Sequence, residues 1–75
     1  MEAEVMKMLA VGLTAGLGLM GPALGIGLIG FSALQGIARN PEASGPIMTN
    51  MILVTAFCEA IGIYALIIAI ILAMI

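Results

Sequence analysis

The sequence predicts an all-α membrane protein, a two-helix transmembrane hairpin that assembles into a closed homo-oligomeric ring. Three observations predict this fold class: the composition, the positions of the charges and the arrangement of the glycines. Of the 75 residues, 64% are hydrophobic and 8% are charged, whereas about 25% of the residues of a soluble domain are charged. With a mean hydropathy of +1.35, the chain has too few polar side chains to cover a soluble surface. We therefore expect it to lie in lipid.

The charged residues divide the chain into two apolar stretches. They are Glu2, Glu4, Lys7, Arg39, Glu42 and Glu59. Residues 8–38 carry no charge, and residues 43–75 carry only that of Glu59. Each stretch exceeds the roughly 20 residues that cross a bilayer as a helix, and lipid offers no hydrogen-bond partner to a backbone that is not helical. The sequence therefore predicts one hairpin domain over residues 1–75, with helices at about 8–38 and 46–75.

Two prolines place a polar loop at about residues 39–45. Pro41 disfavours helical geometry at the preceding Asn40. Pro46 suits the first turn of a helix, because the N–H groups of that turn have no acceptor within the helix and the one that proline lacks is not needed. The first helix should therefore end near Arg39, and the second should begin near Pro46.

A cleaved signal peptide is the alternative for the first apolar stretch. Two glutamates, Glu2 and Glu4, stand where a signal peptide has its basic region. The stretch is also far longer than the roughly 7–15 apolar residues of a signal peptide. We therefore favour a membrane span.

Glycine is concentrated in the first helix, where eight of the ten glycines lie between Gly12 and Gly36. At about 100° per residue, small residues fall on two roughly opposite arcs. One arc holds Gly18, Gly21, Gly25 and Gly36, and the other holds Gly12, Gly16, Ala23, Gly27 and Gly30. Small residues let membrane helices pack closely, so two opposed small faces suit a row of copies that closes into a ring. The alternative is that glycine is merely tolerated in a membrane helix.

Glu59 is the one charged residue in the middle of an apolar stretch. An ionisable group inside a membrane indicates an ion or proton pathway. We expect this carboxyl to be neutral where it faces lipid and to ionise only where water or a cation meets it. The alternative is a structural carboxyl, with Thr55 and Tyr64 as its candidate hydrogen-bond partners. Sodium needs several oxygen ligands, and the next four residues, Ala60 to Ile63, offer no side-chain oxygen, so we expect the ion to be a proton.

The composition also excludes several classes of site. A single cysteine and the absence of histidine exclude a disulfide framework and a cysteine-based metal site, and we expect no metal and no cofactor. Two basic residues cannot form the positive surface that nucleic-acid binding requires. We therefore expect membrane lipid and other protein chains as partners, and no nucleic acid.

Four segments together resemble the c-subunit family of the F-type ATP synthase, the proteolipids of its rotor ring. They are the glycine-rich run through Gly21, Gly25 and Gly27, then Ala38-Arg39-Asn40-Pro41-Glu42, then Phe57-Cys58-Glu59-Ala60, and Ile63-Tyr64. The resemblance covers essentially the whole chain. It implies a lipid-binding membrane protein that performs no catalysis itself.

The resemblance also implies roles for single residues. Glu59 matches the family's ion-binding carboxylate, and Tyr64 matches a tyrosine that hydrogen-bonds near it. Phe57 resembles the residue that proton-carrying members have at this position. Thr55 is a further residue expected to support the proton site. Sodium-type members have a glutamine and a hydroxyl residue at the positions that Ile26 and Ala60 occupy here. Together Arg39, Asn40, Pro41 and Glu42 match the loop that contacts the central stalk, with asparagine in place of the usual glutamine.

The mechanism implied by the resemblance is rotary. A proton enters through a half-channel of the a-subunit of the stator and neutralises Glu59, so that the ring can turn this residue into lipid. An arginine of the stator and a second half-channel then promote release, and rotation drives ATP synthesis in the catalytic head. The implied location is an energy-coupling membrane, the bacterial cell inner membrane, with the loop on the cytoplasmic side.

Two other functions are alternatives. A small multidrug exporter also uses a membrane glutamate, but it generally has more spans and an aromatic-lined pocket, whereas only three aromatic residues occur here. A regulatory or pore-forming membrane peptide does not explain the two glycine faces and the central glutamate together.

Overall fold

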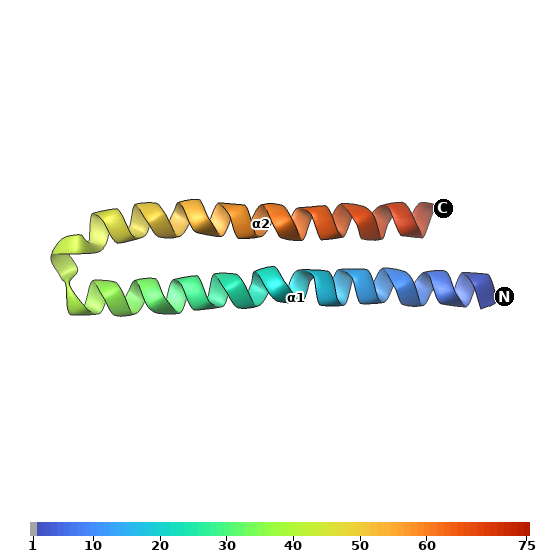
Figure 1. Cartoon of the computed structure of the whole chain (residues 1–75), viewed down its shortest axis with the longest axis horizontal. Coiled ribbons are helices and arrows are strands. Elements are labelled where there is room, and N and C mark those ends of the chain that lie inside the picture. The colour runs from blue at the N-terminus through green and yellow to red at the C-terminus, as the bar shows by residue number, and fades with distance from the viewer. Residues whose placement is uncertain (1) are drawn as a thin grey trace.

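A computed structural model describes residues 2–75 as two long antiparallel helices joined by a tight turn (Figure 1). Helix α1 covers Glu2–Arg39, the 3-10 turn η1 covers Pro41–Ala43, and helix α2 covers Ser44–Met74. The hairpin measures 60 × 15 × 7 Å, and the two chain ends lie together at the end opposite the turn (Figure 1). The predicted two-helix hairpin is confirmed.

Helix α1 begins at Glu2, six residues before the predicted start at about residue 8. The physical reason is the charge at its ends. Glu2 and Glu4 lie in the first turn, and Arg39 lies in the last, so that negative charge meets the positive end of the helix dipole and positive charge its negative end. Helix α1 also continues through Pro22, which has no N–H group to donate to the carbonyl of Gly18.

The turn is shorter than the predicted loop at residues 39–45. Asn40 is the one residue between α1 and η1, and its φ of −142° is the extended geometry that a following proline favours. Its N–H group donates to the carbonyl of Gly36 at 2.9 Å, and its own carbonyl accepts from the N–H group of Ala43 at 2.9 Å. The backbone therefore reverses direction with its hydrogen bonds largely preserved.

Helix α2 begins at Ser44, two residues before the predicted start at about residue 46. The first N–H groups of a helix have no intrahelical acceptor, so Pro46 fits inside the first turn without loss of a hydrogen bond. The side chains of Thr49 and Asn50 donate to the carbonyls of Gly45 and Pro46, at 3.1 and 2.8 Å. These bonds satisfy polar side chains near the turn.

Small residues form the contact between α1 and α2. Ala33 of α1 retains 8% of its surface exposed and Ala69 of α2 retains 4%, and Gly62 of α2 is also buried. Among the glycines, the closest approach is at Gly18, where an added Cβ atom would lie 2.7 Å from the Cβ atom of Ala65. Close backbone approach is what small residues permit in membrane helices.

The two glycine arcs of α1 have different surroundings, and this corrects the prediction that both face other copies. Added Cβ atoms on Gly18, Gly25 and Gly36 would meet Ala65, Cys58 and Ile47 of α2, so these three residues of their arc pack within the hairpin. By contrast, five glycines of α1, one of them Gly21 of this same arc, have nothing within 4 Å of an added Cβ atom. These open glycines are Gly12, Gly16, Gly21, Gly27 and Gly30. The helical periodicity separates two small-residue arcs, but it does not show that α2 covers Gly18, Gly25 and Gly36 of one arc and leaves Gly21 open.

Most of the large apolar side chains lie on the surface. The hairpin exposes 5557 Å², whereas a folded soluble protein of 7.6 kDa would expose about 4,300 Å². Both helices are long and apolar enough to cross a membrane. Their apolar surface therefore has to be covered by lipid or by other chains.

The hairpin is longer than a bilayer is thick. Its 60 Å length exceeds the roughly 40–45 Å of a bilayer with its headgroups. Polar side chains gather toward the turn, on residues of both helices. They are Ser32, Gln35, Arg39, Asn40, Glu42, Ser44, Thr49 and Asn50. We call this end of the hairpin, residues 32–50, the polar tip.

Candidate functional site

Glu59 lies at the middle of α2, as the sixteenth of its 31 residues. It lies eight positions after Met51, the first residue of α2 beyond the polar tip, which at 1.5 Å per residue is about 12 Å of helix. The carboxyl is therefore inside the apolar part of the hairpin.

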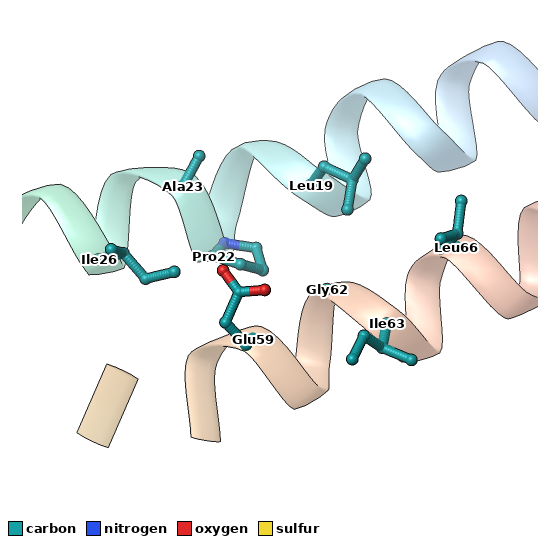
Figure 2. Close-up of a pocket in the computed structure, with 8 residues that line it drawn as sticks. All are labelled: Leu19, Pro22, Ala23, Ile26, Glu59, Gly62, Ile63 and Leu66. Carbon is teal, nitrogen blue, oxygen red and sulfur yellow. The ribbon is translucent and has the colours of Figure 1, made fainter. Parts of the chain in front are cut away.

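Glu59 lines a pocket between the two helices, which we call the Glu59 pocket (Figure 2). Its volume is about 310 Å³. Each helix contributes four residues at spacings of i, i+3, i+4 and i+7, which is one face of a helix. They are Leu19, Pro22, Ala23 and Ile26 of α1, with Glu59, Gly62, Ile63 and Leu66 of α2. Seven of the eight are apolar, so the carboxylate is the one charged group of the pocket.

The Glu59 side chain points across the seam toward α1, beside Pro22 and Ile26 (Figure 2). The residue is nevertheless exposed in the single hairpin, because the pocket opens to the side. Within residues 2–75, side-chain hydrogen bonds are made by Thr49 and Asn50, and Glu59 makes none. The pocket walls that surround the carboxyl are apolar.

Of the five predicted supporting residues, the structure brings Ile26 together with Glu59. Thr55 and Ala60 are half-buried but lie outside the pocket lining. Phe57 and Tyr64 each expose 64% of their surface, and Tyr64 lies about 140° round the helix from Glu59. Within one chain, Tyr64 therefore does not share the pocket of the carboxyl.

Sequence reasoning did not select Pro22 and Gly62, which form the part of the pocket where the helices meet. The spacing of Gly62 at three residues after Glu59 was visible in the sequence and could have indicated a shared face. Pro22 could not be found in this way, because its position opposite Glu59 depends on how the two helices are aligned.

The predicted stalk-contacting loop lies at the polar tip. Arg39 ends α1, Asn40 follows it, and Pro41 and Glu42 belong to η1. All four residues are exposed. The tight turn therefore presents one cation and one anion at the end of the hairpin that carries most of its polar side chains.

A model of the ATP synthase c-subunit family matches residues 9–72, which include both helices, the turn and Glu59. The chain belongs to this family. The ATP synthase c-subunit of Dehalococcoides mccartyi is 61% identical over 72 residues, which cover 96% of this chain and 95% of the relative. The proteins of the same name from Chloroflexus aurantiacus and Prochlorococcus marinus are 44% and 46% identical over 66 residues. These 66 residues cover 88% of this chain, and 87% and 82% of the two relatives.

Membership of the c-subunit family confirms the resemblance read from the sequence. It makes the chain a rotor component of the membrane sector that is not itself catalytic. It also decides against the multidrug exporter and the isolated membrane peptide. The c-subunit is a membrane protein, in agreement with the two long apolar helices of the hairpin.

Proposed function

We propose that this chain carries protons on Glu59 as one of the identical copies in the rotor ring of an F-type ATP synthase. The observation that carries the proposal is the position of Glu59. It is the central residue of α2, and its carboxyl points at the opposing helix within a pocket whose other lining residues are apolar (Figure 2). A lone ionisable group at such a depth is the expected form of a proton carrier.

The lining of the Glu59 pocket favours a proton over a sodium ion. A hard cation such as sodium requires several oxygen ligands. Apart from Glu59, the pocket is lined by hydrocarbon side chains and by Gly62. Ile26 lies in the pocket where a sodium-type member has glutamine, and Ala60 stands where such a member has a hydroxyl. The carboxylate can bind a proton without further ligands.

The proposed cycle alternates the charge of Glu59. The residue can face lipid when it is protonated, because burying an ionised carboxylate in hydrocarbon costs far more free energy than burying a neutral carboxyl. A half-channel of the a-subunit of the stator delivers a proton, and after rotation of the ring the stator arginine and a second half-channel promote its release. Rotation of the ring then drives ATP synthesis. Glu59 holds and releases the proton, and the apolar lining excludes competing cations.

The exposed faces of the hairpin support a ring of copies. The open glycines of α1 have no neighbour within 4 Å of an added Cβ atom, so a second backbone can approach them closely. The exposed isoleucine and leucine side chains of α2 suit lipid. We therefore place α1 on the inner side of the ring and α2 on the outer side.

The polar tip supports contact with the central stalk. A hairpin 60 Å long extends beyond the bilayer, and polar side chains favour projection of the tip into water. Arg39, Asn40, Pro41 and Glu42 are exposed there. We place this end on the cytoplasmic side of the bacterial inner membrane, where the catalytic head would receive the rotation.

Labelling with a hydrophobic carbodiimide tests this function in membranes that contain the assembled complex. The reagent attacks protonated carboxyls in apolar surroundings, so we expect modification of Glu59 and not of the exposed Glu2, Glu4 and Glu42. The reaction should slow as the pH is raised, because the ionised carboxylate does not react. Protection by sodium at fixed pH would contradict proton carriage, and loss of ATP-driven pumping without modification of Glu59 would contradict its role.

A further inference from the structure

Gly62 lies beside Glu59 on the inner face of α2. It is three residues further along the helix, it is buried, and it lines the same pocket, opposite Leu19 and Pro22 (Figure 2). A Cβ atom added to it would lie 3.5 Å from Cδ2 of Leu19 and 3.6 Å from Cβ of Pro22. Position 62 thus lies in the pocket beside the carboxyl and within contact distance of α1.

The requirement for glycine differs between Gly62 and Gly18. At Gly18 an added Cβ atom would lie 2.7 Å from that of Ala65, so the helices could not approach with any larger residue there. At Gly62 the corresponding distances are those of ordinary van der Waals contact. Alanine would fit against α1, and it is also the better helix former. Helix packing therefore does not explain the absence of a side chain at position 62.

We propose that Gly62 is a positioning residue that provides the space in which the Glu59 carboxyl lies against α1. This role rests on the proposed function of Glu59 as the proton carrier. The Cα–Cβ bonds of a helix tilt toward its N-terminus, so a side chain at position 62 would project toward Glu59. It would occupy the pocket and displace the carboxyl from Pro22 toward the open side.

Larger side chains at position 62 can extend into the Glu59 pocket. Leu19 and Pro22 already lie within 3.6 Å of an added Cβ atom, so the further carbons of valine cannot point at α1 without separating the helices. They can enter the Glu59 pocket, which has a volume of about 310 Å³. Alanine should therefore displace the carboxyl partially, and valine should displace it more.

The test compares Gly62→Ala and Gly62→Val with the wild type in membranes that contain the complete ATP synthase. We expect Glu59 to react faster with the hydrophobic carbodiimide in both variants, because a carboxyl displaced from the pocket meets a reagent dissolved in lipid. One added carbon in an apolar pocket changes an equilibrium by about tenfold or more. For alanine we expect the labelling rate of Glu59 to increase by up to about tenfold. ATP-driven proton pumping should fall in the same order, from wild type to alanine to valine.

Two further variants separate positioning from a general effect on the hairpin. Gly36→Ala adds the same methyl group at the same helix interface, against the flexible end of Ile47, and should leave the labelling rate of Glu59 unchanged. Ile26→Val removes one carbon from the opposite wall of the Glu59 pocket. Combined with Gly62→Ala, it should return the labelling rate toward that of the wild type.

The outcomes distinguish this inference from the function on which it rests. Wild-type Glu59 that resists the reagent, or that sodium protects, would contradict proton carriage and the role of Gly62 with it. Normal labelling of the wild type with an unchanged rate in Gly62→Ala would contradict only the role of Gly62. Faster labelling that Ile26→Val does not reverse would also overturn it, since the effect would then not arise from pocket volume.

Discussion

Gly18 of α1 packs directly against Ala65 of α2, so closely that a Cβ atom on Gly18 would lie 2.7 Å from that of Ala65. The Cβ atom of alanine is fixed to the backbone and cannot rotate away. This contact sets the separation of the two helices four residues before Pro22 and close to the Glu59 pocket. The position of the carboxyl relative to α1 therefore depends on a glycine outside the pocket.

The first prediction concerns this contact. Overpacking at an interface costs about 1–3 kcal/mol, and the better helix propensity of alanine returns about 1 kcal/mol. We therefore expect Gly18→Ala to lower the free energy of unfolding by about 1 kcal/mol, measured by denaturant titration of the detergent-solubilised protein. The double variant Gly18→Ala with Ala65→Gly should recover most of the loss, because it restores the space. Additive effects of the two changes would contradict the contact.

A second prediction concerns the charge of Glu59. Glu59→Gln retains the size of the side chain but cannot ionise, so we expect it to abolish ATP-driven proton pumping in inverted membrane vesicles. Glu2→Gln is the matched control, because Glu2 is exposed in the first turn of α1, and it should pump normally. Residual pumping by Glu59→Gln would show that another group carries the proton.

The open glycines give a third prediction. Gly16→Leu and Gly27→Leu add side chains where nothing in the hairpin lies within 4 Å, so the helicity of the monomer should be unchanged. If a second copy packs on this face, each change should prevent assembly, seen as a loss of the detergent-resistant oligomer by mass measurement. Gly45→Leu adds the same side chain next to the turn, also without a neighbour within 4 Å, and should assemble normally. A full-size oligomer from both variants would contradict close packing of copies on these glycines.

The fourth prediction tests why sodium is not bound. Ile26 lies in the Glu59 pocket, so Ile26→Gln places an amide oxygen beside the carboxylate. Together with Ala60→Ser, it should make carbodiimide labelling of Glu59 sensitive to sodium, because a hard cation gains two further oxygen ligands. Ile29→Gln with Ala60→Ser is the control, since Ile29 lies outside this pocket. Equal insensitivity of the two double variants would show that other groups determine the selectivity.

The hairpin could be predicted from the sequence because its causes are local. Apolar stretches long enough to cross a bilayer must form helices there, and Pro41 places the turn through its effect on Asn40. The helix ends were predicted less accurately, since the favourable charges of Glu2 and Glu4 and the tolerance of the first turn for Pro46 extend both helices beyond the apolar stretches.

The site was predicted in part. Glu59 follows from its isolation among apolar residues, and Ile26 follows from the family resemblance. Pro22 lies opposite Glu59 because of the way the two helices align. The spacing of side chains along one helix does not predict that alignment. For the same reason, the arc of Gly18 and Gly25 was assigned to other copies of the chain, although α2 of the same hairpin covers it.

The sequence by itself determined that this protein is a membrane hairpin of the ATP synthase c-subunit family with one central carboxylate, because composition and charge position act through the bilayer on each helix separately. The tertiary structure decided which residues surround that carboxylate and which glycines stay open. Both depend on the alignment and separation of the two helices, which are set by contacts between residues far apart in the chain, such as Gly18 with Ala65.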